Sequence, residues 1–249
     1  NQVGEISNSA NYELNINRVK GDNYLKKHKL IGTSTLLNND SLLLSNFDIN
    51  WNYGSSSLNT SFKIYEDLTR VYSDRYQYIY PDFKYIKRIE IPNNYNGNFD
   101  FSSYGYNKNY NTNINESVLT NDFLFSSNEY VTSNGISTNY NLLLKNSNSY
   151  SNNSTTFDNN ANYNLYSTLK IDTSLPLQKK INEYIHYLKP VASIRYSPNG
   201  NKNISDKDIL LNYDSAFSLN RIGTPHQVEG GKALTLGLEF KRNYLDGSN

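Results

Sequence analysis

Apolar and polar side chains alternate without a break in Phe47-Asp48-Ile49-Asn50-Trp51-Asn52-Tyr53. Successive side chains of a β-strand point to opposite faces, so this alternation predicts a strand with one apolar face and one polar face. The same two-residue period returns in four other segments, namely residues 12–17, 58–64, 140–144 and 234–241. The repetition predicts an all-β protein whose strands share this two-faced character.

Turn-forming residues separate the alternating segments. They occupy residues 38–41, 54–57 and 133–135, and Asn134-Gly135 in the last group favours a type I′ hairpin. Strands that are joined by such short turns run antiparallel. With about ten residues per strand plus a turn, the chain has room for an antiparallel meander of roughly 11–13 strands.

Two segments depart from the simple pattern. Residues 176–189 place Leu177, Ile181, Ile185 and Leu188 at helical spacing, so a helix is one interpretation. We favour instead a strand over residues 163–175, a turn over residues 178–182 and a strand over residues 184–196, in which Pro190 lacks an amide hydrogen for the ladder. The Asn- and Ser-rich residues 146–160 are interpreted as a long exposed loop.

The composition excludes several classes of function. Cysteine is absent, which rules out disulfides, thiolate metal sites and cysteine nucleophiles within the chain. The net charge of +1 and the lack of a basic block argue against binding to nucleic acid. No run of about 18 apolar residues is present for a transmembrane helix, whereas a transmembrane β-strand needs only about 9–11 residues.

The character of the polar face distinguishes a soluble sheet from a membrane barrel. A soluble sandwich needs solid apolar runs for its two-layer core, and such runs are few in this sequence. Residues 1–249 are therefore expected to form part of a large transmembrane β-barrel, with lipid outside and water inside. The expected lumen-facing side chains are Asn50, Asn52, Lys63, Glu239 and Lys241, and the tyrosines expected at strand ends, in an interfacial girdle, are Tyr53, Tyr80, Tyr104 and Tyr106.

Motifs for catalysis or metal binding are lacking. The histidines His28, His186 and His226 lie far apart without a ligand spacing, so we expect neither a metal site nor a cofactor. Asp206, Asp208 and Asp214 lack the glycine and the distal glutamate of a calcium-binding hand and are interpreted as a solvated loop. Arg221 and Glu229 are expected to pair across a loop as a structural tie, the alternative being contact with a substrate. These observations indicate a protein that is not an enzyme.

The second half of the chain resembles the barrel domain of the lipopolysaccharide-assembly protein (LptD) family, in its alphaproteobacterial form. The resemblance is carried, in order, by residues 174–177, 186–192, 196–199, 214–221 and 228–231, which lead into the closing strand 233–241, and more weakly by residues 73–83. Together the convincing portion covers about a quarter of the chain. The sequence departs from the family at residues 222–227, where the family has an aromatic residue, a glycine and an Asp-Arg pair, so that pairing is not carried over.

The resemblance implies a transport function rather than a reaction. Lipopolysaccharide would enter the barrel from a periplasmic bridge protein of the LptA type and leave sideways into the outer leaflet, beside a plug lipoprotein of the LptE type, in the outer membrane of a Gram-negative bacterium. The intact barrel would have about 26 strands, and this chain would supply roughly half, without the periplasmic N-terminal domain and the terminal strands. The family motif would place Asp214, Asn220, Arg221, Glu229, Gly230 and Gly231 in one loop. The alternatives are a general porin or nutrient channel, and a secreted soluble β-sheet protein.

Overall fold

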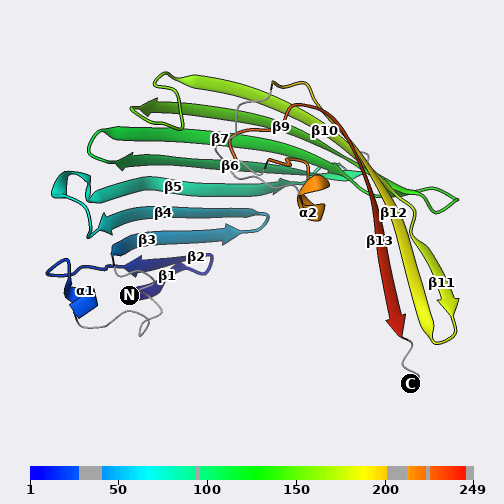
Figure 1. The fold of residues 1–249 in the computed structure, drawn as a ribbon, viewed down its shortest axis with the longest axis horizontal. Helices are drawn as coiled ribbons and strands as arrows, with labels where there is room; N and C mark the ends of the chain where they lie inside the picture. Colours follow the sequence, from blue (N-terminus) through cyan, green and yellow to red (C-terminus); the bar gives the residue numbers. More distant parts are fainter. Residues whose placement is uncertain (28–40, 93–95, 201–211, 223–224, 245–249) are drawn as a thin grey trace. The chain divides into compact units, whose positions relative to one another are not determined.

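The computed structural model describes residues 1–27, 41–92, 96–200, 212–222 and 225–244 (Figure 1). Strands make up 67% of the residues and helices 4%, so the predicted all-β class is confirmed. The strands are β1 (Gln2–Ser7), β2 (Ala10–Asn15), β3 (Leu42–Tyr53), β4 (Ser56–Asp67), β5 (Tyr76–Ile89), β6 (Gly97–Tyr110), β7 (Ile114–Ser127), β8 (Tyr130–Val131), β9 (Ser137–Asn152), β10 (Asn162–Ser174), β11 (Leu177–Ile181), β12 (Tyr184–Ser197) and β13 (Gly231–Tyr244). The helical segments are α1 (Tyr24–Lys27), the 3-10 turn η1 (Tyr72–Asp74) and α2 (Tyr213–Ala216).

The strands form one antiparallel meander of the predicted size. Strands that follow one another in the sequence are hydrogen-bonded neighbours from β1 to β7, and the order continues through β9, β10 and β12 to β13 (Figure 1). The short β8 pairs with β9, and β11 pairs with β12. In the described part of the chain β1 and β13 each have one partner, so this ladder is open.

Contacts within the sheet divide the chain into two compact units. The first contains residues 1–88, 101–121 and 146–164, and the second contains residues 89–100, 122–145 and 165–249. The strands β6, β7, β9 and β10, and the last residue of β5, contribute to both units. The candidate site residues are therefore described within their own unit.

The register of β3 and β4 produces the two faces that the alternation predicts. Phe47 lies opposite Phe62 on one face, whereas Asp48 lies opposite Ser61 on the other. The apolar face remains accessible, because Phe62 is 45% exposed. Clusters of buried apolar residues are small in the described chain: one joins Leu43 and Leu68, and the other joins Leu143, Tyr166 and Val228. The apolar faces are thus not stacked into a two-sheet core.

The region with helical spacing is a β-hairpin. Leu177–Ile181 forms β11, which pairs in register with residues 184–188 of β12, so neither the alternative helix nor the predicted turn at residues 178–182 is present. The turn lies at residues 182–183, where Asn182 has a φ of +53° in the left-handed region that asparagine tolerates. Pro190 sits inside β12 opposite Leu238, and its carbonyl accepts a hydrogen bond from the amide of Leu175.

Other local predictions also need correction. Residues 146–152 of the predicted long loop belong to β9, where Ser147 and Ser151 are buried. The turn before β9 is closed by a bond from the Gly135 amide to the Thr132 carbonyl, and Asn134 does not have the positive φ that a type I′ turn requires. Of the four tyrosines expected at strand ends, Tyr53 ends β3, but Tyr80, Tyr104 and Tyr106 lie inside their strands.

Some predicted features fall on residues that the structure does not describe. They include most of the turn at residues 38–41, together with His28, Asp206 and Asp208. Among the described residues no helix is long and apolar enough to cross a bilayer.

Candidate functional site

A polar surface follows the first unit along β3, β4 and β5. Asn50 and Asn59 lie opposite each other and are joined by a hydrogen bond between their side chains, and Asn50 also donates to Asn11 at 3.2 Å. Lys63, two positions beyond Ser61, forms an ion pair with Asp82 at 2.6 Å. The structure therefore places Asn50 and Lys63 in one connected polar surface.

Asn52 lies at the exposed end of the same strand. It is opposite Ser57, and its backbone amide donates to the carbonyl of Ser9 at 2.8 Å. The side chain extends the polar row of Asp48 and Asn50 by one further position, because residues two apart share a face. Nothing in the described contacts distinguishes it as a ligand-binding group.

The second unit has a polar surface that is covered by part of its own chain. We use the name strap for residues 213–230, of which residues 213–222 and 225–230 are described. Lys170 of β10 donates to the carbonyl of Phe217 at 2.6 Å, and Thr235 of β13 donates to the carbonyl of Ala216 at 3.2 Å. Strand side chains thus satisfy carbonyls of a segment that has little secondary structure of its own.

Lys145 of β9 holds the strap at Pro225. Its ammonium group lies 2.6 Å from Asp122 and donates to the carbonyl of Pro225 at 2.8 Å. The residue is 4% exposed, so its charge is buried and must be compensated by these oxygen atoms. This contact ties the strap to β9 and β7.

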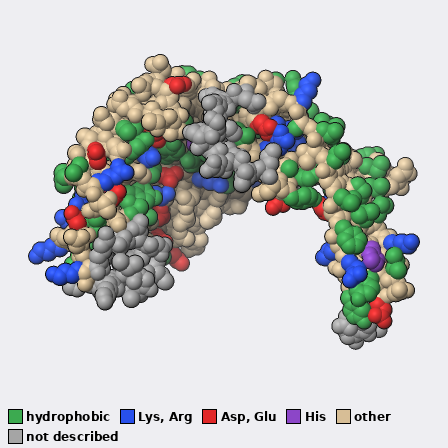
Figure 2. Space-filling view, in the orientation of Figure 1, with side chains coloured by type: hydrophobic (Ala, Val, Ile, Leu, Met, Phe, Trp, Pro, Cys, Tyr) green, Lys and Arg blue, Asp and Glu red, His purple; other side chains and the backbone are tan. Residues whose placement is uncertain are grey.

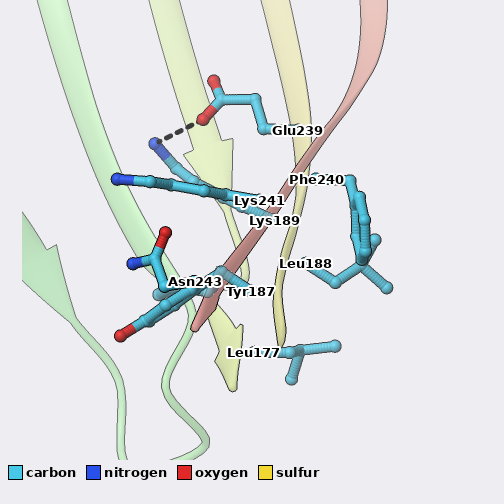
Figure 3. Close-up of a pocket in the computed structure, with 9 residues that line it drawn as sticks. Leu177, Tyr187, Leu188, Lys189, Glu239, Phe240, Lys241 and Asn243 are labelled. Carbon is cyan, nitrogen blue, oxygen red and sulfur yellow. Dashed lines mark ion pairs between the residues drawn. The ribbon is translucent and has the colours of Figure 1, made fainter. Parts of the chain in front are cut away.

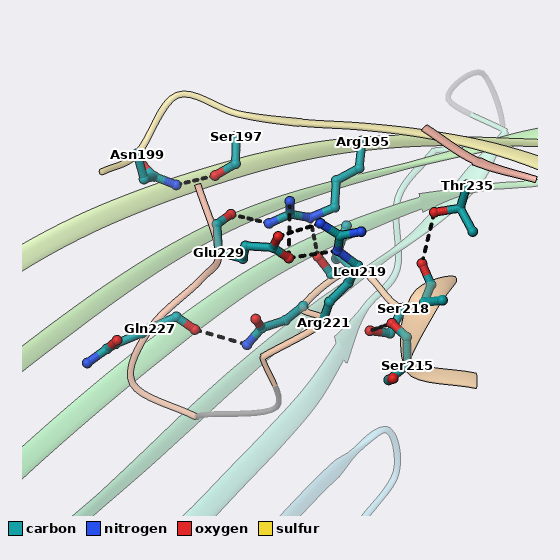
Figure 4. Close-up of polar contacts among 12 residues, drawn as sticks. Arg195, Ser197, Asn199, Ser215, Ser218, Leu219, Arg221, Gln227, Glu229 and Thr235 are labelled. Carbon is teal, nitrogen blue, oxygen red and sulfur yellow. Dashed lines mark hydrogen bonds and ion pairs between the residues drawn. The ribbon is translucent and has the colours of Figure 1, made fainter. Parts of the chain in front are cut away.

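Arg195 of β12 holds the middle of the strap (Figure 4). It is 3% exposed and donates to the carbonyls of Leu219, at 2.9 Å, and Glu229. The Glu229 carboxylate lies 3.6 Å from the same guanidinium and also receives two hydrogen bonds from Arg221, one of them at 2.7 Å. The predicted tie between Arg221 and Glu229 is therefore present, and the buried Arg195 forms its third member.

Arg195, Arg221 and Glu229 form a triad of charges, and the two arginines shift the pKa of the Glu229 carboxyl. The hydrogen bonds from Arg221 lower the pKa of the Glu229 carboxyl, and the charges of Arg221 and Arg195 act in the same direction, against the opposing effect of burial. The same hydrogen bonding raises the pKa of Arg221. Glu229 is consequently held as a carboxylate in the folded protein.

Apolar contacts complete the strap. Val228 is 3% exposed and packs with Leu143 of β9 and Tyr166 of β10, and Leu219 packs against this cluster. The strap also presents Phe217 to Gly237 of β13, where an added Cβ atom would lie 2.7 Å from the phenyl ring. The absence of a side chain at Gly237 allows this close approach.

The remaining motif residues take local roles in the same segment. Asp214 lies in the first turn of α2, which is capped by reciprocal bonds between Asn212 and Ser215. Asn220 donates to the carbonyl of Gln227 at 2.9 Å. Gly230 is buried, and Gly231 begins β13 with a φ of +92°, which favours glycine.

A shallow groove of about 570 Å³ lies beside β11, β12 and β13 (Figure 3). Glu239 and Lys241 both line it, and Glu239 lies 3.8 Å from Lys189 and accepts a hydrogen bond from Tyr213 at 2.8 Å. Figure 3 shows Lys189, Glu239 and Lys241 on one side of the strands, and Leu188 and Phe240 on the other. The groove therefore marks the margin between two chemically different faces.

The opposite face of these strands is apolar and exposed. Leu234, Leu236, Leu238 and Phe240 of β13 are 62–72% exposed. Hydrophobic side chains are visible at the surface over β12 and β13 in Figure 2. Large contiguous apolar surface is rare on monomeric soluble proteins and marks contact with a protein or a membrane.

Sequence reasoning did not single out Lys145, Lys170 and Arg195. Their positions in alternating segments assign them to the polar face, but their partners are carbonyls of the strap, which have no sequence signal. In the described part of the chain no three side chains of His, Cys, Asp or Glu gather as metal ligands. The chain matches no protein-family model, and no curated protein is similar to it.

Replacement of Glu229 by Gln should loosen the strap. The substitution leaves Arg195 and Arg221 uncompensated, and because Glu229 is partly accessible we expect a loss of about 2 kcal/mol, below the value for a fully buried pair. Chymotrypsin should then cleave after Phe217 roughly 30-fold faster, if cleavage follows the opening equilibrium. The matched control is Glu183→Gln, in the turn before β12. Adding Arg221→Gln to the Glu229 variant should recover part of the resistance, and an unchanged cleavage rate in the single variant would contradict the role of the triad.

The strap should also loosen in acid. A carboxyl group with a lowered folded pKa contributes stability above its ordinary pKa of about 4.3, and this contribution disappears as the pH falls through the lowered value. We therefore expect the ratio of pepsin cleavage rates in the strap, Glu229→Gln over wild type, to decline toward one between about pH 5 and pH 2. Use of a ratio cancels the pH dependence of pepsin. A ratio that stays constant over this range would show that Glu229 does not titrate in the tie.

Proposed function

We propose that this chain forms part of the wall of an outer-membrane β-barrel that transports lipopolysaccharide, as the sequence resemblance to the LptD family implies. The observation that carries the proposal is a band of apolar side chains on one face of β13, bounded at each end by a basic residue. The band contains Leu234, Leu236, Leu238 and Phe240 and lies between Lys232 and Arg242.

The dimensions of the band match a bilayer. Lys232 and Arg242 are ten residues apart, which corresponds to about 33 Å along a strand. With the tilt of about 40° that membrane strands adopt, the height is about 25 Å, equal to the apolar band of outer-membrane barrels. This spacing is the one expected of a strand that crosses the apolar core of a bilayer.

Aromatic residues accompany the basic ones at both ends of the band. The Lys232 ammonium lies 5.8 Å from the ring centre of Tyr196, and the Arg242 guanidinium lies 4.5 Å from that of Tyr184. Tyrosine and long basic side chains place an apolar body beside lipid and a polar tip in water. The two pairs occupy the positions of the interfacial girdles in such a wall.

Strand length supports the same proposal. The nine long strands, from β3 to β7 together with β9, β10, β12 and β13, have 12–16 residues each. A membrane crossing needs about 9–11 residues, whereas strands of soluble proteins average about 5–6. The extra residues extend each strand beyond the bilayer.

The polar face supports a role in transport. Asn50, Asn52 and Lys63 in the first unit, and Glu239 and Lys241 in the second, are proposed to line the water-filled side and to meet the phosphorylated sugars of lipopolysaccharide. The acyl chains would remain in an apolar environment, because exposure of apolar chains to water is unfavourable. No covalent step is required. A plug lipoprotein and a periplasmic bridge are the proposed protein partners.

A charge placed on the apolar band should impair membrane insertion. Leu238→Lys should cost about 2–4 kcal/mol, because the residue lies near the middle of the band. The matched control Asn243→Lys, on the polar face of the same strand, should have little effect. The measurement is the urea midpoint of the whole barrel protein that contains this chain, folded in phospholipid vesicles. If Leu238→Lys is neutral and the protein is monodisperse without detergent, the membrane proposal is wrong, since an exposed residue of a soluble protein tolerates lysine.

Photo-crosslinking distinguishes transport of lipopolysaccharide from a passive channel. A benzoylphenylalanine in place of Asn50 or Lys241, in cells that make lipopolysaccharide, should give lipopolysaccharide adducts detected by antibody. The control position Leu236 faces the opposite side and should yield fewer lipopolysaccharide adducts and more phospholipid adducts. A general porin would instead give no lipopolysaccharide adduct at Asn50 or Lys241 and would conduct ions across planar bilayers.

A further inference from the structure

Three nitrogen-bearing side chains form a row across β11, β12 and β13. Lys179 lies opposite His186, and His186 lies opposite Arg242, so the three share one face of the sheet. The ring of His186 lies 6.0 Å from that of Phe240, which places the row on the same face as the apolar band. Because neighbouring strands are about 4.8 Å apart, this basic row is about 10 Å long.

The basic row has no carboxylate partner in the described part of the chain. Glu239 is on the other face of β13 with Lys189 (Figure 3), and Glu183, in the turn, makes no ion pair with the row. Lys179 and Arg242 lie about 10 Å apart, on either side of His186. An anion bound between Lys179 and Arg242 would be attracted by both charges, and the intervening His186 would add a ring N–H donor.

The surroundings of the basic row are apolar. On one side the basic row borders Leu177, Leu188 and Phe240, which lie opposite one another on the three strands. These residues are two positions closer to the middle of the apolar band. Leu177 is 45% exposed and Phe240 is 64% exposed. On the other side of the basic row, Ile181, Tyr184 and Tyr244 lie opposite one another on the same three strands. A ligand that fits this surface has an anionic group joined directly to apolar chains.

We propose that the basic row binds the phosphate headgroup of a bilayer lipid, whose acyl chains lie along Leu177, Leu188 and Phe240. The inference rests on the proposed function, because it needs this face to meet a membrane. Lys179 and Arg242 donate charge-assisted hydrogen bonds to the phosphate oxygens. A free phosphate ion would satisfy the charge but not the apolar surface, so the lipid is the ligand that complements both.

The test compares two double variants that remove the same charge from opposite faces of these strands. Lys179→Gln with Arg242→Gln alters the basic row, and Lys180→Gln with Lys189→Gln is the matched control. The whole barrel protein that contains this chain is folded in phosphatidylcholine bilayers with or without about 20% phosphatidylglycerol, and retained lipid is counted by native mass spectrometry. The row variant should lose affinity for phosphatidylglycerol by about tenfold or more, and the control by less than twofold. Lys179→Arg, which keeps the charge, should retain binding.

The outcomes separate this inference from the proposed function. Equal losses in the two double variants, or no preference of the wild type for phosphatidylglycerol over phosphatidylcholine, would overturn the headgroup site while leaving the membrane wall intact. Displacement of the lipid by millimolar inorganic phosphate would identify a free-anion site instead. Failure of the whole barrel protein to enter either kind of bilayer would contradict the proposed function and this inference together.

Discussion

Register along the long antiparallel strands is the constraint on which the structure depends. Every strand must satisfy its backbone groups by pairing with its neighbours, and the two-residue period then sorts side chains into two faces. The β12–β13 pair keeps this sorting over its whole length, from Tyr184 opposite Tyr244 to Ser197 opposite Gly231. A slip of one residue would exchange the apolar and polar faces of a strand. The register is therefore fixed, because each face must stay in its own environment, apolar or polar.

The polar face and the apolar face differ in what covers their side chains. On the polar side of the second unit, the strap supplies carbonyls and one carboxylate to Lys145, Lys170 and Arg195. These partners make the burial of charged groups tolerable, since a buried charge without partners is strongly unfavourable. On the apolar side of β13 no such cover exists among the described residues, and four large side chains remain mostly exposed. The asymmetry is what a sheet between water and lipid requires.

The proposed transport function and the proposed headgroup site use this asymmetry at different places. An amphiphile with phosphorylated sugars and acyl chains needs polar contacts on one face and apolar surroundings for its chains. The basic row lies where the apolar band ends, so Lys179 and Arg242 can hold a phosphate while Phe240 contacts the chain below it. The proposed site differs from the polar face in ligand as well as position, because its neighbours Leu177 and Leu188 would favour a lipid already in the bilayer.

The sequence by itself determined the class of the fold and the identity of each face. Alternation in segments such as 47–53 and 234–241 predicted the strands and the side on which Asn50, Lys63, Glu239 and Lys241 lie, because side-chain direction in a strand is a local property. The short turns between these segments predicted the antiparallel order. The pairing of Arg221 with Glu229 was also within reach, since the two residues are close in the chain.

Only the tertiary structure decided what covers each face. The spacing of Leu177 and Ile181 fits a helix, but pairing with β12 makes the segment a strand, because a ladder of hydrogen bonds outweighs a weak local preference. The partners of Lys145 and Arg195 are backbone carbonyls, and every residue carries one, so no sequence pattern marks them. The basic row joins residues 179, 186 and 242 through the register of three strands, a long-range relation that the order of residues alone does not contain.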